Sequence, residues 1–298
     1  MLDTHANDSV SIIIPTSGNS VYVRRLAEDL RSELQSTQEC VEVIILDNRK
    51  SLEPSTELRE IAQSLGERGR YIHHPLGGKS AALNHAIPEA RGDILLFLDD
   101  DMRIAPGWLS ACLAFFRETP YDLMQGRILP DPADDLSPHE YPMVPTCDKG
   151  ESRRDFQGLG GGNVGGRARW YQQFPFDERL GVGASGAGED SKFAHQAQDA
   201  GARIGYEPKA LVYHPLIPGR ATQANFRRSH YLSGKSSLAY RNWGVVRLLW
   251  NVTWRWAAYC ASRLVRVERS KVQRHEAALF RNLGRLVGTL ENRLEREK

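Results

Sequence analysis

Residues 93–101, DILLFLDDD, give the clearest indication of the fold class of this chain. Five consecutive apolar residues without polar alternation predict a strand that is buried on both faces, which is typical of a parallel sheet covered by helices. The apolar run stops abruptly at Asp99, Asp100 and Asp101. Because clustered carboxylates repel one another, such a cluster at a strand end favours a bound divalent cation. The alternative interpretation is a solvated acidic turn.

Similar but shorter runs surround this stretch, and amphipathic segments separate them. The predicted strands are 10–16, 41–48, 70–75, 93–101, 123–130 and 203–215, and the predicted helices are 20–35, 55–66, 79–87, Pro106 to about Glu118, and 189–200. Strand and helix alternating at this spacing predict parallel strands joined by right-handed crossovers. The predicted fold class is therefore α/β, with a Rossmann-like, mostly parallel central sheet flanked by helices and a helical C-terminal extension.

Four of these predicted strands end in residues that include polar groups, and open sheets of this kind bind ligands at the carboxyl ends of their strands. The residues are Pro15 and Thr16, Asp47 and Asn48, His73 and His74, and the three aspartates. In an extended segment alternate residues face the same way, so Asp99 and Asp101 are expected to converge while Asp100 points elsewhere. Carboxylates in this arrangement suit Mn²⁺ or Mg²⁺ bridging to a diphosphate.

Two further sites carry candidate chemistry. Glu189 and Asp190 open a helix directly after the glycine-rich segment 181–188, so they are either helix-capping residues or a general base for an acceptor hydroxyl. His214 ends an apolar run, and its imidazole could complete a metal site or simply be hydrogen-bonded.

The segment HPLGGKS, residues 74–80, contains part of a phosphate-binding loop motif. The full motif needs glycine at position 73, where His73 stands, so we reject this interpretation. Lys79 remains a plausible partner for a nucleotide base or phosphate. No GxGxxG follows the first strand, which disfavours a dinucleotide-binding fold.

The charge is unevenly distributed along the chain. Residues 220–298 carry 17 Lys/Arg and 5 Asp/Glu, whereas the rest carries 22 and 32, so that the formal net charge is +2. On the predicted helix 245–266, Arg247, Asn251, Arg255, Ser262 and Arg266 share one face, and tryptophan and leucine fill much of the rest. Such a helix could lie on an anionic membrane, or pack on the catalytic domain or on a dimer partner.

Other features of the sequence indicate the cellular compartment of the protein. The polar N-terminus does not resemble a signal peptide, and no apolar run is long enough to predict a membrane span. Four scattered cysteines without a CxxC pair favour reduced thiols and a cytoplasmic protein, either free or associated with the cytoplasmic face of a membrane. We find no nucleic-acid-binding motif and expect no nucleic-acid partner.

Taken together, the motifs in residues 10–215 resemble those of the inverting family-2 glycosyltransferases of GT-A fold. The resemblance rests on SIIIPT, EVIILDN, KSAALNHAIPEARGDILLFLDDD, FDERLG and GAGEDSKFAHQAQDAGARIGYEPKALVYHP, in that order. It implies donor-binding roles for Pro15, Thr16, Asp47, Lys79, Asn84, Asp99 and Asp100. It also implies metal ligands at Asp99, Asp101 and His214, and a base at Asp190 with Glu189 beside it.

The resemblance implies that one sugar is transferred with inversion from a nucleotide diphosphate sugar, most simply a UDP-sugar, to an acceptor hydroxyl that the sequence does not name. No QxxRW motif of polymerising members occurs, which favours a single transfer. We expect a catalytic domain over 1–220, with a nucleotide-sugar-binding half (10–120) and an acceptor half (121–220), and a basic helical extension over 221–298. A sugar nucleotidylyltransferase and a non-catalytic nucleotide-sugar-binding protein stay open as alternatives.

Overall fold

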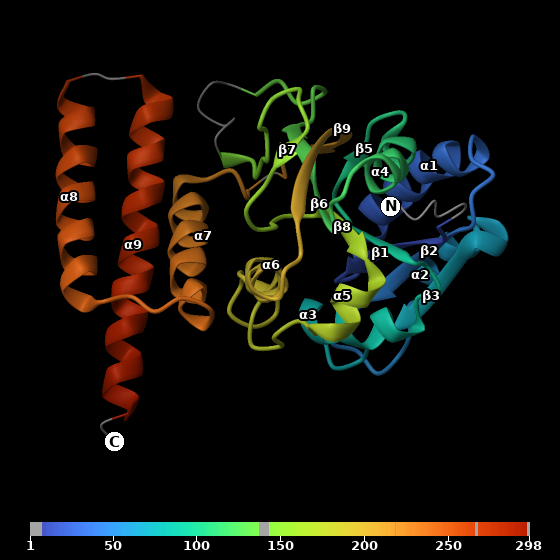
Figure 1. Ribbon diagram of the computed structural model, residues 1–298, viewed down its shortest axis with the longest axis horizontal. Helices are drawn as coiled ribbons and strands as arrows, with labels where there is room; N and C mark the ends of the chain where they lie inside the picture. Colours follow the sequence, from blue (N-terminus) through green and yellow to red (C-terminus); the bar gives the residue numbers. More distant parts are fainter. Residues whose placement is uncertain (1–7, 137–142, 218, 266–267, 297–298) are drawn as a thin grey trace. The chain divides into compact units, whose positions relative to one another are not determined.

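The computed structural model describes residues 8–136, 143–217, 219–265 and 268–296 (Figure 1). Their contacts divide the chain into two compact units, each treated by itself below. The sheet unit comprises the residues up to Asp134, Pro145–Arg179 and Glu189–Pro215. The helical unit comprises 135–144, Leu180–Gly188 and the chain from Leu216 onward. The contacts thus place the main division just after Pro215, and the predicted boundary at 220 stays a prediction.

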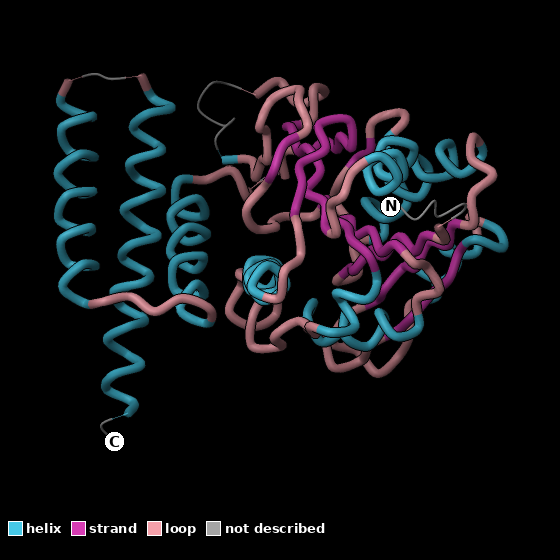
Figure 2. The backbone as a smooth tube through the Cα atoms, viewed as in Figure 1, coloured by secondary structure: helices cyan, strands magenta, loops and turns pink. Residues whose placement is uncertain are grey.

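The sheet unit is built on a sheet of nine strands, counted over the described residues (Figure 2). The strands are β1 (Val10–Thr16), β2 (Val41–Asp47), β3 (Gly69–His73), β4 (Ile94–Leu98), β5 (Arg103–Ile104), β6 (Leu123–Pro130), β7 (Arg154–Asp155), β8 (Asn163–Arg167) and β9 (Ile204–His214). Their order is β3-β2-β1-β4-β8-β6-β9-β5, with β7 paired to β9. The strands β1 to β4 are parallel, as predicted, whereas β8 runs antiparallel between β4 and β6.

Helices cover both faces of this sheet, which explains why its first strands are continuously apolar. The helices are α1 (Ser20–Gln35), α2 (Thr56–Gln63), α3 (Lys79–Ala86), α4 (Trp108–Glu118), α5 (Ala168–Gln173) and α6 (Glu189–Asp199). Ile12 and Ile14 of β1 pack with α1, α2 and α4, whereas Ile13 packs on the opposite side with α3, α5 and α6. The mixed α/β architecture with flanking helices is the predicted fold class.

The strand β8 was not predicted, because its sequence NVGGR carries little apolar signal. Its glycines are nevertheless required at the centre of the sheet. A Cβ atom on Gly165 would lie 2.5 Å from Leu96 Cδ2, and one on Gly166 would lie 2.3 Å from Leu123 Cδ2. Close packing between neighbouring elements, rather than hydrophobic periodicity, therefore selects glycine here.

The buried Asn163 joins three segments at the end of β8. Its side-chain amide donates to the carbonyls of Arg127 and Ala210, at 3.0 and 2.8 Å, and its Oδ1 accepts from Trp108 Nε1 at 3.0 Å. Asn163→Ala removes the hydrogen bonds to all three groups, and each buried group left without a partner costs about 1–3 kcal/mol. We expect the free energy of unfolding to fall by several kcal/mol in chemical denaturation. As a control, Gln172→Ala replaces an exposed side chain on α5 and should change the free energy of unfolding by less than about 0.5 kcal/mol.

The helical unit contains α7 (Gln223–Ser236), α8 (Val245–Leu264) and α9 (Arg269–Arg296), with α9 between the other two (Figure 1). Glycines allow α7 and α9 to approach closely, since a Cβ on Gly234 would lie 2.0 Å from the Arg281 carbonyl oxygen. The predicted helix 245–266 corresponds to α8, and Arg266 lies outside the described residues. Within the described residues, no helix combines the length and the hydropathy that a transmembrane segment requires.

Candidate active site

The three aspartates follow β4 in a turn, so the alternation expected for an extended strand does not apply to them. Each contacts a different partner. Asp99 accepts a hydrogen bond from Lys79 Nζ at 2.7 Å, and Asp100 accepts one from Thr16 Oγ1 at 2.6 Å. Asp101 Oδ1 lies 3.9 Å from His214 Nε2. Within the described part of the chain, no three His, Cys, Asp or Glu side chains are grouped as one metal site.

Asp101 and His214 nevertheless form a pair whose chemistry suits a cation. The carbonyl oxygen of Pro215, which can only accept, lies 3.0 Å from His214 Nδ1. This contact favours the proton on Nδ1 and leaves a lone pair on Nε2 in the neutral imidazole. Two electron-pair donors therefore face each other across 3.9 Å, and both side chains are almost buried, at 11 and 12% exposure. An oxygen and a nitrogen donor in this arrangement fit a divalent metal.

Lys79, the first residue of α3, supplies the positive charge at Asp99. Its Nζ also lies 3.7 Å from Glu189 Oε1. Burial opposes the charged form, but Asp99, Asp190 and Glu189 outweigh it and raise the pKa of Lys79. The ammonium group therefore stays protonated, and it connects the aspartate turn after β4 to the start of α6.

Asp190 lies in the first turn of α6 beside the buried Glu189. Burial, followed by the charge of Glu189, raises the pKa of Asp190 to about 7, and Asp99 acts in the same direction. Lys79 and a backbone hydrogen bond from Gly161 oppose the shift. The buried hydroxyl of Tyr171 has no hydrogen-bond partner among the described residues, and burial, together with the charge of Asp190, raises its pKa. A carboxylate that titrates near neutral pH can accept a proton from a substrate.

The glycine-rich loop 160–163 connects the two groups of carboxylates. The carbonyl of Gly162 accepts from the backbone N–H of Asp99 at 3.1 Å, while Gly161 bonds Asp190. Gly162 has φ +54°, and a Cβ there would lie 2.6 Å from Asp99 Oδ2. A side chain at Gly162 would therefore displace Asp99, which explains the glycine at this position.

Asp47, the predicted base-binding residue, is completely buried and already satisfied. Its carboxylate accepts two side-chain bonds from Arg49 at 3.0 Å and one from the Tyr71 hydroxyl at 2.6 Å. Burial alone would raise the pKa of Asp47, but these bonds lower it. The half-exposed Arg49 lies over the loop after β1, where its Cδ would meet a Cβ on Gly18 at 2.4 Å. Sequence reasoning missed Arg49 and Tyr71, although Arg49 stands only two residues after Asp47.

The other predicted donor-binding residues lie at different places. Pro15 is buried in β1, paired with Leu46. The Asn84 amide donates to the Phe176 carbonyl at 2.9 Å and accepts from the Phe176 N–H at 2.8 Å. Asn84 therefore holds the segment after α5. The structure brings together Thr16, Lys79, the three aspartates, Glu189 and Asp190, whereas Asn84 is used for packing.

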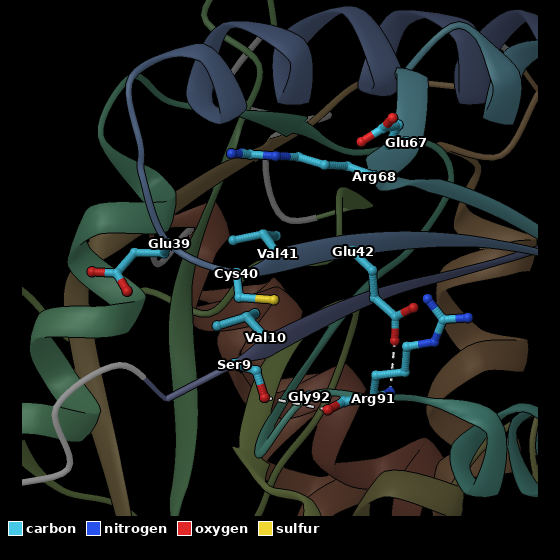
Figure 3. Close-up of a pocket in the computed structure, with 10 residues that line it drawn as sticks. All are labelled: Ser9, Val10, Glu39, Cys40, Val41, Glu42, Glu67, Arg68, Arg91 and Gly92. Carbon is cyan, nitrogen blue, oxygen red and sulfur yellow. Dashed lines mark hydrogen bonds between the residues drawn. The ribbon is translucent and has the colours of Figure 1, made fainter.

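A pocket lies at the opposite ends of β1 and β2, where the strands begin (Figure 3). Its polar groups bind one another. Ser9 Oγ donates to the Arg91 carbonyl at 3.2 Å, and the Arg91 N–H donates to Glu42 Oε1 at 2.7 Å. Glu42 also accepts from Ser11 and Arg70. Since these groups are satisfied by the protein, we assign no ligand to this pocket.

Comparison with known proteins shows which family and fold the chain shares. The chain is 28% identical over 219 residues to the succinoglycan biosynthesis protein ExoM of Rhizobium meliloti (strain 1021), covering 70% of this chain and 69% of that protein. It superposes with a TM-score of 0.66 on the mannosyltransferase PcManGT from Pyrobaculum calidifontis, solved with GDP-Man and Mn²⁺, at 15% identity and with coverage of 95 and 89%. GalNAc-T7, solved with UDP, GalNAc and Mn²⁺, gives 0.55 at 13% identity, with coverage of 78 and 48%.

These structural similarities identify the GT-A fold and leave the donor undecided, because the two solved complexes hold different nucleotides. The family model for glycosyl transferase family 2 matches residues 11–179, which is more than half of the chain. That match includes the aspartate turn, Lys79 and the loop 160–163. The chain therefore belongs to glycosyl transferase family 2 and has the GT-A fold of those enzymes.

Proposed function

We propose that this protein transfers a single sugar from a UDP-sugar to an acceptor hydroxyl with inversion, using Asp190 as the general base. The observation that carries the proposal is the position of Asp190, one residue from the Glu189 that lies 3.7 Å from Lys79 Nζ, with Lys79 bound to Asp99. One ammonium group thus contacts both a donor-binding carboxylate and the residue next to the proton acceptor.

Asp101, His214 and Asp99 would hold a Mn²⁺ or Mg²⁺ ion, and Asp99 would do so by exchanging part of its contact with Lys79. When bound, the ion would neutralise the diphosphate of the donor and so stabilise the leaving group. Lys79 adds a second positive charge for the same phosphates. The Pro215 carbonyl fixes the His214 tautomer that leaves Nε2 available for the ion.

On the nucleoside side, Asp47 acts through Arg49. Because the Asp47 carboxylate is saturated by Arg49 and Tyr71, it orients the guanidinium, and Arg49 contacts the base or ribose. Thr16 fixes Asp100 in the same way, so that Asp100 is held at the ribose end of the donor site. Asn84 supports the donor site indirectly, by holding the backbone at Phe176.

The acceptor hydroxyl attacks the anomeric carbon from the face opposite the leaving diphosphate, and its proton passes to Asp190. The bond between the sugar and the phosphate breaks as the new glycosidic bond forms, so the configuration inverts. The raised pKa of Asp190 makes this carboxylate a stronger base than an exposed aspartate.

Product analysis separates transfer from its rivals. With a UDP-sugar, Mn²⁺ and an acceptor or water, we expect free UDP and no pyrophosphate, and the transferred sugar should show the inverted anomeric configuration by NMR. A sugar nucleotidylyltransferase would release pyrophosphate when given UTP and a sugar phosphate. A non-catalytic protein would bind the donor without consuming it. Either result would contradict the proposal. If the protein used GDP-sugars and no UDP-sugars, the proposed UDP-sugar donor would be wrong.

We also infer a cytoplasmic site of action. All four cysteines are free, which suits a reducing compartment. In this proposal the partners are the nucleotide sugar and the acceptor, and no nucleic acid is involved.

A further inference from the structure

The helix α8 packs with its polar side toward the rest of the helical unit. The structure buries Leu248 and Ser262 of this helix, and it half-buries Asn251, Arg255 and Tyr259 on the same side. The Tyr259 hydroxyl donates to Glu276 of α9 at 3.4 Å, and Glu276 is itself buried. A polar contact therefore joins α8 to α9 on the side of α8 that carries the buried Leu248.

The opposite side of α8, called the outer face below, is apolar and aromatic. Its large exposed side chains are Val246, Leu249, Trp250, Trp254, Trp256 and Leu264, and the exposed Val265 follows directly after the helix. Trp250, Trp254 and Trp256 are 71, 62 and 59% exposed, whereas Trp108 and Trp170 of the sheet unit are 1 and 9% exposed. A helix of a water-soluble unit normally turns its apolar stripe toward the core. The orientation of α8 is the reverse, and contiguous exposed apolar surface of this kind marks an interaction site.

The charge around the outer face indicates what covers it. The helix α8 contains three arginines and no acidic residue, and residues 220–298 carry 17 basic against 5 acidic side chains. At 100° per residue, the exposed Arg247 and Arg263 lie at opposite margins of the outer face. A second copy would bring the same positive charges to the contact, which disfavours a dimer through this face. Anionic lipid headgroups bring the complementary charge, and tryptophan is enriched at the membrane interface.

We propose that α8 lies flat in the interfacial layer of an anionic membrane, with the outer face toward the acyl chains and Arg247 and Arg263 among the headgroups. The geometry is that of an interfacial helix, since none of the described helices is able to span the bilayer. This inference is independent of the reaction assigned to the sheet unit, because it rests on residues of α8 and α9 alone.

The test uses the full chain in vesicle flotation, with phosphatidylcholine alone or mixed with phosphatidylserine. We expect binding and a blue shift of tryptophan fluorescence with the anionic vesicles only, and weaker binding as salt is raised. Replacing Trp250, Trp254 and Trp256 together with glutamine should lower the partition coefficient at least about tenfold. Arg247→Gln and Arg263→Gln should each lower it about fivefold.

Matched controls come from the sheet unit. Leu52→Gln and Arg24→Gln remove an exposed leucine and an exposed arginine, and both should leave vesicle binding unchanged. Circular dichroism checks that the variants stay folded, which the exposure of the replaced side chains favours. Absence of binding to anionic vesicles at low salt would overturn the proposal, as would equal binding by the triple tryptophan variant. A dimer in light scattering that the triple variant dissociates, without vesicle binding, would show that the outer face binds protein instead.

Discussion

Replacing Asp190 with asparagine is expected to lower kcat by about 10²- to 10⁴-fold, the usual contribution of a general base. Asparagine keeps the shape of the side chain but cannot accept the proton of the acceptor hydroxyl. Donor binding should be retained or slightly strengthened, because one negative charge disappears near Lys79 and the donor phosphates. Initial rates of UDP release measure the first effect, and calorimetry with UDP and Mn²⁺ measures the second.

The pH dependence provides an independent readout of the same group. The pKa of Asp190 is raised to about 7, so the carboxylate is protonated and inactive below that pH and available above it. We expect kcat/KM of the wild type to rise about tenfold per pH unit below 7 and then to level off. The charged and titratable groups around Asp190 are Glu189, Lys79, Asp99 and Tyr171. In Asp190→Asn this rise should disappear.

A matched control lies on the same helix. Asp199→Asn changes an exposed carboxylate at the other end of α6, where Asp199 Oδ2 lies 3.5 Å from His195 Nδ1, and it should keep both the rate and the pH profile. Near-normal turnover in Asp190→Asn would contradict the base assignment. An equal loss in both variants would instead indicate a general effect on the stability of α6.

Replacing Asp101 with asparagine should abolish most of the gain in donor affinity that Mn²⁺ provides. The lost carboxylate faces His214 Nε2 at 3.9 Å, and removing one charged ligand from such a site is expected to weaken metal-dependent UDP binding about 100-fold, roughly 3 kcal/mol. His214→Gln should act in the same direction with a smaller effect, since it removes a neutral ligand. Calorimetry with Mn²⁺ alone, and with UDP in the presence and absence of Mn²⁺, measures each contribution.

The control for this series is Glu60→Gln, which neutralises an exposed carboxylate on α2. It should leave both metal-dependent and metal-independent binding unchanged. Metal binding by Asp101→Asn at wild-type strength would exclude Asp101 as a ligand. If Asp101→Asn lost metal-dependent UDP binding and His214→Gln kept it, the aspartates alone would be the ligands of the ion.

Local patterns in the sequence determined much of the fold. The helix predicted over 20–35 occurs as Ser20–Gln35, and the strand predicted over 123–130 occurs as Leu123–Pro130. Such elements are predictable because a strand buried on both faces needs a continuous apolar run, and an amphipathic helix needs its own spacing. The same rules placed Thr16, Asp47 and the three aspartates at the ends of parallel strands, where the structure has them.

Local sequence patterns were thus enough to predict the type and order of the elements, and the gathering of polar residues at one edge of the sheet. The partner of each polar group, by contrast, depends on how distant parts of the chain pack together. The turn after β4 directs Asp99 to Lys79, Asp100 to Thr16 and Asp101 to His214, and no local pattern specifies contacts between such distant residues. Likewise, β8 and the orientation of α8 depend on what packs against them. The glycines of β8 give no pattern of apolar residues that would predict a strand. The helix α8 has an apolar and a polar face, and its sequence does not specify which of them is buried.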